Sequence, residues 1–299
     1  MKSATCSSEE FVYINGEFVP KENAKISVWD HGLLYGDGVY EAIRVYEGNI
    51  FKLKEHIDRL YNSAKAIKIE IPMTKEELLE AVVELVKRNK LRNGYLRIIV
   101  TRGVGFMGVD PRNCEKPTII IMSELRKALF GGKPITAIVS TIRRFPSQCL
   151  DPKIKSLNYL NNVLAKIQAI EAGTDDAIML NMEGYVAEAV TENIFVVKKN
   201  IIYTPPLTAG ILEGITRSVV IEIAKNLGFE VREENLTIYD LYTADEVFLT
   251  GTAAEITPVV KIDGRLVGNG EPGPIFKKIL EEYQKIVKDP KFGVKVQEG

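Results

Sequence analysis

Residues 210–217 read GILEGITR, and this stretch indicates a loop that leads into a helix. Gly210 and Gly214 interrupt the apolar pattern, and helical spacing begins near Thr216. The first N–H groups of a helix have no partner inside the helix, and its positive end attracts anions. The stretch therefore predicts an anion cradle of phosphate size, although a plainly capped helix would have a similar sequence.

Apolar runs on both sides of this stretch predict a domain of helices and short strands. Gly173 and Gly228 each follow a run of helical spacing, where glycine commonly ends a helix. The elements expected are a strand at 135–142, a helix at about 158–172, short strands through 176–203, a helix at about 214–227, strands at 229–232 and 246–250, and an amphipathic helix near 274–288.

The first part of the chain also predicts mixed structure. Apolar runs flank Asn15-Gly16, a strong hairpin signal because both turn positions tolerate positive φ. A second hairpin is expected around Glu47-Gly48-Asn49, and Thr74 with Glu77 forms a capping-box pattern. The elements expected are hairpins at 11–19 and 39–52, helices at 54–67 and from Thr74 to about Lys90, and strands at 95–101 and 117–122.

A break in the pattern divides the chain. Residues 125–134 read LRKALFGGKP, whose glycines and proline indicate a linker. The fold class expected is α+β, with an N-terminal α/β domain at 1–126, a linker at 127–134 and a C-terminal domain at 135–299. A chain of 299 residues agrees with two domains.

Composition excludes several classes of protein. The 39 basic and 40 acidic residues leave a net charge of −1, which argues against nucleic-acid or anionic-membrane binding. The two histidines nearly exclude a His-rich metal site, and the three dispersed cysteines form no disulfide framework. With no membrane-length apolar run and no signal peptide, a cytoplasmic protein is expected.

Two familiar catalytic patterns receive little support. Residues 103–108 have the GxGxxG form of a dinucleotide-binding dehydrogenase, but Pro111 follows where a helix should run. A mobile glycine-rich loop is the better interpretation. His31 or His56 could serve a hydrolytic serine, but no GxSxG elbow is present, and His56 is expected on a helix surface.

A stronger combination joins three further stretches to the anion cradle. Residues 153–159 (KIKSLNY) place two lysines in a loop entering a helix, and Glu188 lies between short apolar runs. Residues 250–255 (TGTAAE) follow a strand and offer backbone amides and hydroxyls. Taken singly, each has a plain explanation: solvated lysines, a carboxylate at a sheet edge and a tight turn.

Taken together, these stretches resemble the fold-type IV pyridoxal-phosphate enzymes. The motifs HGLLYGDGVYEAIRVYEGNIF, HIDRL, KSLNYLNN, GYVAEAVTENIF, ILEGITR and GTAAEITPV occur in the order found in that family and span about residues 11–285. The resemblance implies a smaller N-terminal domain, a larger cofactor-binding domain with a barrel-like sheet, and pyridoxal 5'-phosphate as cofactor.

The resemblance also implies roles for cofactor-binding residues. Lys155 matches the catalytic lysine that carries the cofactor, with Lys153 as a surface charge. Glu188 matches the carboxylate that faces the pyridine nitrogen and keeps it protonated. The remaining matches are Arg59 for the phosphate, Tyr159 for the ring hydroxyl, and Leu212, Ile215, Thr216 and Thr252 for the phosphate cradle and its surroundings.

Substrate positions follow from the branched-chain aminotransferases within this family. Tyr95 would help to hold the substrate's α-carboxylate with the amides of Thr252 and Ala253, and Arg97 would receive the side-chain carboxylate of glutamate. Met107 matches a residue that the partner subunit contributes to the active site, so a homodimer or larger homo-oligomer is expected. Tyr35 and Tyr40 complete the pocket residues that match.

The sequence favours one member of the family. D-amino acid aminotransferases carry an Arg-x-His pair after the TRG strand, whereas Gly103 to Val109 read GVGFMGV here. We therefore expect an L-branched-chain amino-acid aminotransferase that uses 2-oxoglutarate in a ping-pong mechanism. A D-amino acid aminotransferase, an aminodeoxychorismate lyase, a dehydrogenase and an inactive binding protein of the same fold are the alternatives.

Overall fold

The computed structural model describes residues 10–130 and 132–296, and these form two compact units. The first unit runs to Arg126 and includes the chain from Lys288 onward, and the second spans Lys127–Val287. Cys114 and Cys149 are free thiols, whereas Cys6 lies outside the described residues. No helix in the described part is long and apolar enough to cross a bilayer.

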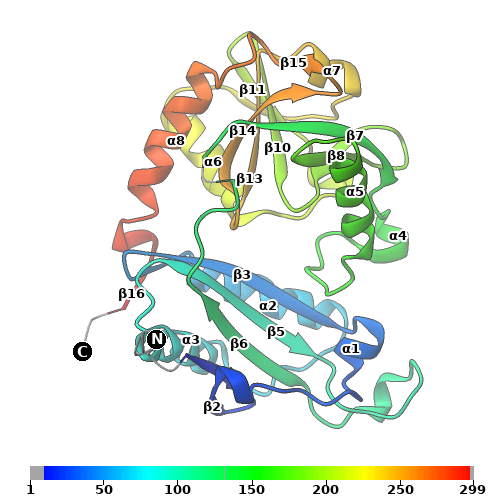
Figure 1. Ribbon diagram of the computed structural model, residues 1–299, viewed down its shortest axis with the longest axis vertical. Helices are drawn as coiled ribbons and strands as arrows, with labels where there is room; N and C mark the ends of the chain where they lie inside the picture. Colours follow the sequence, from blue (N-terminus) through cyan, green and yellow to red (C-terminus); the bar gives the residue numbers. More distant parts are fainter. Residues whose placement is uncertain (1–9, 131, 297–299) are drawn as a thin grey trace, which may run out of the picture. The chain divides into compact units, whose positions relative to one another are not determined.

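The first unit is built on a seven-stranded sheet in the order β16-β4-β3-β5-β6-β1-β2, with α2 and α3 packed against it (Figure 1). Its elements are β1 (Phe11–Ile14), β2 (Glu17–Pro20), η1 (Lys21–Asn23), α1 (His31–Tyr35), β3 (Gly38–Tyr46), β4 (Asn49–Phe51), α2 (Leu53–Ala66), α3 (Lys75–Arg88), β5 (Gly94–Thr101), η2 (Pro111–Asn113), β6 (Thr118–Glu124), η4 (Pro290–Phe292) and β16 (Gly293–Lys295).

Both predicted hairpins are confirmed. Strands β1 and β2 pair antiparallel around Asn15 and Gly16, whose φ angles are 49° and 103°. Strands β3 and β4 pair around Glu47 and Gly48, with φ angles of 52° and 80°. Two consecutive positive φ values are what a two-residue turn requires to match the strand twist.

Strand β3 separates two chemically different faces. Successive side chains of a strand point to opposite faces, so Tyr40 and Glu41 lie on opposite sides of the sheet. Glu41 is fully buried on the side covered by α2, where it bonds to His56. Tyr40 shares its side with Arg97, because Ala42 pairs with Arg97 across β3 and β5.

The second unit is built on a nine-stranded sheet in the order β12-β11-β10-β13-β14-β7-β8-β9, with β15 paired to β14. Helix α5 packs on β7 and β8, and α6 and α8 pack on β13 (Figure 1). Its elements are β7 (Ile135–Arg143), α4 (Ser147–Leu150), α5 (Leu160–Glu171), β8 (Asp176–Leu180), β9 (Val186–Ala189), β10 (Asn193–Lys198), β11 (Ile201–Thr204), η3 (Leu207–Ala209), α6 (Ile215–Asn226), β12 (Val231–Glu233), α7 (Ile238–Tyr242), β13 (Glu246–Gly251), β14 (Glu255–Ile262), β15 (Arg265–Leu266) and α8 (Pro274–Ile286).

The structure adds elements that the sequence interpretation omitted. Helix α1 is capped by the Asp30 side chain, which accepts from the Gly32 amide, and α7 has a capping box of Thr237 and Asp240. Strand β16 pairs with β4, so the end of the chain belongs to the first unit. The division based on sequence had assigned residues 135–299 to one domain.

The prediction for His56 was wrong. Its side chain lies on α2, but it is buried against Glu41 and only 2% exposed. The dinucleotide interpretation also fails, because no α-helix begins between described residues 102 and 114. Pro111 instead starts the short 3-10 helix η2, capped by Asp110.

Candidate active site

Lys155 lies in a pocket of the second unit together with three other predicted residues. The loop after α4 brings Lys155 and Tyr159 to the pocket, where Glu188 and Leu212 also line the wall. Lys155 is 8% exposed, whereas the side chain of Lys153 is 53% exposed and lies 3.6 Å from Asp151. The structure therefore separates the two lysines as the sequence predicted, with one buried and the other at the surface.

Glu188 is held by donors on both of its oxygens. Its Oε1 lies 2.7 Å from a guanidinium nitrogen of Arg144, and its Oε2 accepts from the Asn193 amide at 3.0 Å and from the Leu212 backbone N–H at 3.1 Å. Strand β9 lies at the edge of its sheet, yet Glu188 is 5% exposed. The carboxylate is thus held by hydrogen bonds inside the protein and is not a solvated side chain at a sheet edge.

Burial raises the pKa of Glu188, and four surrounding features oppose that rise. The Arg144 guanidinium has the largest opposing effect, followed by the Leu212 N–H bond and the charges of Lys155 and Arg217. Lys155 and Glu188 therefore belong to one electrostatic environment. A buried acid and a buried amine in one pocket are typical of a catalytic site.

The segment predicted as an anion cradle lies at the start of α6. Gly214 is the N-cap, and no described side chain caps this end of the helix. A Cβ on Gly214 would lie 1.9 Å from Asn193 Oδ1, so only glycine allows this close approach. The Asn193 amide also donates to the Leu212 carbonyl at 2.9 Å, which joins the cradle to Glu188. Ile215 and Thr216 lie in the first turn, and Thr216 is buried.

Thr252 and Ala253 lie in the turn between β13 and β14. The turn is followed by Glu255, a non-glycine residue with a φ of 59°. The Ala253 carbonyl accepts from the Leu129 N–H at 2.7 Å. The segment predicted as a linker therefore contacts the turn that carries these two predicted residues.

Arg59 forms a bidentate ion pair with the buried Glu41 carboxylate in the first unit. Its Nε and one terminal nitrogen donate to the two oxygens of Glu41 at 2.6 and 2.9 Å. His56 Nδ1 lies 2.7 Å from Glu41 Oε2, and because a carboxylate only accepts, that nitrogen carries the proton. Arg59 and His56 hold the pKa of Glu41 well below its usual range despite complete burial.

Three of the predicted substrate residues lie together on the other face of this sheet. An Arg97 terminal nitrogen donates to the Tyr95 hydroxyl at 3.1 Å. The same guanidinium lies 4.7 Å from the centre of the Tyr40 ring. The cation is therefore positioned by two aromatic rings and lies on a face that also carries Arg44.

Tyr35 contacts the loop at residues 103–110 that carries Met107, called the 103–110 loop below. The Tyr35 hydroxyl accepts from the Gly108 N–H at 2.6 Å, and His31 Nε2 lies 2.9 Å from the Phe106 carbonyl oxygen. The apolar tip of the loop is strongly exposed, with Met107 at 73%. The loop thus exposes apolar side chains at a tip whose backbone is hydrogen-bonded to α1.

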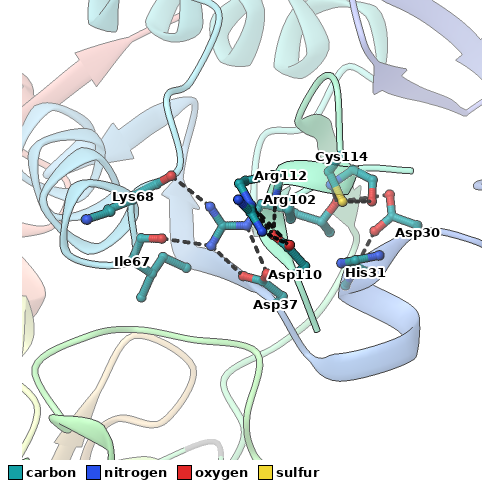
Figure 2. Close-up of polar contacts among 12 residues, drawn as sticks. Asp30, His31, Asp37, Ile67, Lys68, Arg102, Asp110, Arg112 and Cys114 are labelled. Atoms are coloured by element: carbon teal, nitrogen blue, oxygen red, sulfur yellow. Dashed lines mark hydrogen bonds and ion pairs between the residues drawn. The ribbon is translucent and has the colours of Figure 1, made fainter. Parts of the chain in front are cut away.

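Arg102 fastens the base of this loop, as Figure 2 shows. Its guanidinium donates to both Asp37 oxygens at 2.9 and 3.0 Å and to the carbonyls of Ile67 and Lys68 at 2.7 Å each. The exposed pair of Asp110 and Arg112 lies further along the loop (Figure 2). Mobility was predicted for this glycine-rich segment and stays a prediction. Arg102, just before the loop, is hydrogen-bonded to Asp37 and to residues 67–68.

Comparison with known proteins decides the family. The family model of class IV amino-transferases matches residues 38–262. The chain belongs to the class IV aminotransferases. This confirms the family and the fold expected from the sequence motifs.

Members of the class IV aminotransferases align along nearly the whole chain. A Methanocaldococcus jannaschii protein, provisionally named a branched-chain-amino-acid aminotransferase, is 55% identical over 95% of this chain and 98% of its own length. The branched-chain-amino-acid aminotransferase of Escherichia coli K12 is 38% identical over 93% of both chains. The crystal structure of the T.th. branched-chain amino acid aminotransferase complexed with N-(5'-phosphopyridoxyl)-L-glutamate has a TM-score of 0.90 and 44% identity, covering 95% of this chain and 96% of that one.

Sequence reasoning missed several residues of this aminotransferase site. Arg144 and Asn162 line the pocket, and an Arg144 terminal nitrogen donates to Asn162 Oδ1 at 3.2 Å. Asn193 was within the quoted motif GYVAEAVTENIF but received no role. Arg144 follows strand β7 with no motif around it, so only the fold reveals its contact with Glu188. No group of three His, Cys, Asp or Glu side chains in the described residues is arranged to hold a metal ion.

Proposed function

We propose that this chain transfers the amino group of L-branched-chain amino acids to 2-oxoglutarate, with pyridoxal 5'-phosphate as cofactor. The observation that carries the proposal is the pocket in which buried Lys155 and buried Glu188 lie together beside Tyr159. Relatives named as branched-chain aminotransferases support the substrate class, and a relative's complex with a phosphopyridoxyl compound supports the cofactor.

The residues present fit a phosphorylated pyridoxal. The uncapped start of α6 and the glycine at its N-cap suit a phosphate, which prefers the positive end of a helix. When bound, pyridoxal phosphate supplies an aldehyde that bonds to amines and a ring that withdraws electrons from the adjacent carbon. We assign the phosphate to Ile215, Thr216, Thr252 and Arg59.

Each protein group has a defined task in the proposal. Lys155 would hold the cofactor through its Nζ, and once the substrate's amine has released this nitrogen it would take up the proton that leaves the substrate's Cα. Glu188 keeps a proton on the ring nitrogen, and Arg144, Asn193 and the Leu212 N–H fix the orientation of its carboxylate. Tyr159 donates to the ring hydroxyl.

The two ends of the substrate receive separate partners in the proposal. Tyr95 and the amides of Thr252 and Ala253 hold the α-carboxylate, and Arg97 receives the second carboxylate of glutamate. Tyr40 lies against the Arg97 guanidinium and presents an aromatic surface to apolar side chains. One set of residues can thus accept an apolar amino acid and an acidic one in turn.

The test of the reaction uses purified protein with L-leucine, L-isoleucine or L-valine and 2-oxoglutarate. We expect glutamate to form with each amino acid, and we expect visible cofactor absorbance that Lys155→Ala abolishes. Lys153→Ala is the matched control and should keep both properties. Turnover of D-alanine alone would overturn the substrate assignment, and pyruvate release from aminodeoxychorismate would instead indicate the lyase.

Assembly of at least two copies is part of the same proposal, as is a cytoplasmic location. Phe106, Met107 and Val109 expose apolar side chains at 75%, 73% and 82%. We assign the 103–110 loop to the substrate pocket of a partner subunit. Sedimentation should show a dimer or larger species, and Met107→Asp should weaken both assembly and turnover. A fully active monomer would contradict this role.

A further inference from the structure

Asp30 anchors helix α1 at the strand ends between which the 103–110 loop lies in the chain. Its Oδ1 accepts from the Gly32 N–H at 2.8 Å, and its Oδ2 accepts from the hydroxyls of Thr101 and Thr118 at 2.9 and 2.7 Å. Thr101 ends β5 and Thr118 begins β6. Asp30 is fully buried. The start of α1 and both strand ends are therefore fixed to one carboxylate.

Backbone hydrogen bonds fix the first residues of the loop to the start of α1. The His31 N–H donates to the Gly103 carbonyl at 2.9 Å, and the Gly105 N–H donates to the Trp29 carbonyl at 3.2 Å. Gly105 has no room for a side chain, because a Cβ there would lie 2.7 Å from Cys114 Sγ and 2.9 Å from His31 Nε2. The His31 ring therefore lies directly against the loop backbone.

Two side chains of α1 hold the tip of the loop on either side of Met107. His31 Nε2 lies 2.9 Å from the Phe106 carbonyl oxygen, and because that oxygen only accepts, the nitrogen carries the proton. The Tyr35 hydroxyl accepts from the Gly108 N–H at 2.6 Å. This carbonyl and this N–H belong to the two peptide groups that flank the Met107 Cα. We call the two side chains, His31 and Tyr35, the α1 clamp.

The two members of the α1 clamp support each other. His31 and Tyr35 are four residues apart on α1, a spacing that places both side chains on one face of a helix. Their ring centroids are 5.0 Å apart with an interplanar angle of 85°, the edge-to-face arrangement that aromatic rings prefer. His31 is 1% exposed and Tyr35 is 38% exposed. The clamp thus joins a buried donor to a partly exposed acceptor.

We propose that His31 and Tyr35 are positioning residues that fix the direction of the Met107 side chain and thereby the preference of the enzyme for apolar amino acids. With both flanking peptide groups bonded, rotation of the Met107 backbone is restricted before any substrate arrives. A surface that is already ordered binds without a further cost in conformational entropy. This role rests on the proposed function, in which the 103–110 loop belongs to the substrate pocket of a partner subunit.

The α1 clamp should matter more for apolar substrates than for acidic ones. The loop tip offers the apolar side chains of Phe106, Met107 and Val109, whereas the second carboxylate of glutamate is assigned to Arg97. A tip that is no longer held loses contacts with leucine and leaves Arg97 unchanged. Because general damage to the fold would weaken both substrates, the ratio of their affinities is the specific readout.

The first measurement follows hydrogen exchange in the apoprotein and needs neither cofactor nor substrate. His31→Met removes the donor and keeps a long side chain, and His31→Gln has nearly the same shape as methionine but retains an N–H donor. In His31→Met, amides at 105–109 should exchange about tenfold faster, the effect of losing about one hydrogen bond. Strands β3 and β5 should exchange as in the wild type, and His31→Gln should match the wild type throughout.

The second measurement uses the holoenzyme in single-turnover half-reactions, followed by cofactor absorbance. In His31→Met the apparent dissociation constant of L-leucine should rise about tenfold, the effect of losing about one methylene contact in an apolar pocket. That of L-glutamate should change by no more than about twofold, within the usual scatter of distant substitutions. His31→Gln should restore the wild-type ratio of the two constants.

Tyr35→Phe tests the other member of the α1 clamp and remains informative if a His31 variant fails to fold. It removes one hydroxyl from a partly exposed side chain. Exchange at Gly108 should increase, and the preference for L-leucine over L-glutamate should fall, as in His31→Met.

Three results would overturn these positioning roles. Faster loop exchange with an unchanged ratio of the two dissociation constants would show that the α1 clamp orders the loop without selecting substrates. Wild-type exchange in both His31→Met and Tyr35→Phe would show that other contacts hold the tip. Equal effects of His31→Met and His31→Gln would assign the change to loss of the ring. Failure of the proposed function would appear separately, as no reaction of the wild type with either amino acid.

Discussion

Glu41 shows how one buried residue decides the geometry of a predicted binding residue. Arg59 was assigned to a phosphate because of the HIDRL motif, and in the structure Glu41 occupies its Nε and one terminal nitrogen. A guanidinium carries five N–H donors, and the bonds to Glu41 orient this one. The acid on β3 therefore sets the direction of the Arg59 guanidinium.

Replacing Glu41 by Gln should destabilise the protein by about 3 kcal/mol at neutral pH, because buried His56 and partly buried Arg59 lose their anionic partner. The folded pKa of Glu41 is depressed, so its stabilisation is complete above its usual value of 4.5 and declines as pH falls below it. The difference in unfolding free energy between the variants, measured by denaturant titration, should shrink below that pH.

Exposed Glu47 provides the control for this experiment, because it pairs with Lys288 at the surface. Glu47→Gln should change stability little at any pH. A constant difference between the wild type and Glu41→Gln down to pH 3 would contradict the depressed pKa.

At the scale of elements, two glycine-containing segments owe their shape to close contacts. Gly103 has a φ of 98°, and a Cβ there would lie 1.7 Å from the Lys116 carbonyl oxygen. Gly214 has an ordinary extended backbone, but its Cβ would collide with Asn193 Oδ1. The first glycine is required by conformation and crowding, and the second by crowding alone.

We expect Gly214→Ala to disrupt the cradle rather than the fold. The added methyl group must displace the Asn193 amide, which removes a donor from Glu188 and shifts the start of α6. Cofactor affinity should fall at least tenfold, as followed by absorbance titration, while the thermal midpoint changes little. Lys225→Ala in the last turn of α6 is the control. An unchanged affinity in Gly214→Ala would contradict the role of this N-terminus.

Arg102→Leu tests the attachment of the 103–110 loop. Loss of bonds to Asp37 and two carbonyls should cost about 2 kcal/mol, because hydrogen bonds to a charged group are each worth more than neutral ones. Proteases should then cut between residues 103 and 110 faster than in the wild type. Arg112→Leu breaks the exposed ion pair between Asp110, the last residue of the loop, and Arg112 in η2, and it should leave the cleavage rate unchanged. Equal cleavage of both variants would refute the attachment.

At the scale of the whole molecule, the chain returns to its first unit after completing the second. The Lys52 N–H donates to the Phe292 carbonyl, and the Val296 N–H donates to the Gly48 carbonyl. Buried Asn49 donates to the Asp289 carbonyl. These bonds place β16 at an edge of the first sheet, which would otherwise be formed by the short strand β4.

A chain that ends at Val287 should therefore be less stable in its first unit. The truncation exposes the backbone of β4 and removes the partner of Asn49, a buried polar group. We expect a lower thermal midpoint and faster hydrogen exchange at residues 49–51, with the exchange of β8 to β10 unchanged. Exchange that increases equally in both units would show that the C-terminal strand has no local role.

Local sequence determined much of this protein. The hairpin turns follow from Asn15-Gly16 and Glu47-Gly48, since few residues tolerate two positive φ values in succession. The capping box at Thr74 and the glycines after α5 and α6 set helix boundaries within a few residues. The motif order gave the family, and burial agrees with the choice of Lys155 over Lys153.

Tertiary structure decided the features that depend on contacts between distant segments. Helical spacing could not reveal that His56 faces Glu41, because the acid lies on β3, 15 residues earlier. Arg144 meets Glu188 only because β7, β8 and β9 are neighbours in one sheet, which brings the two segments together. A side chain's local sequence fixes its backbone conformation, whereas its charge state and partners depend on what the fold packs against it.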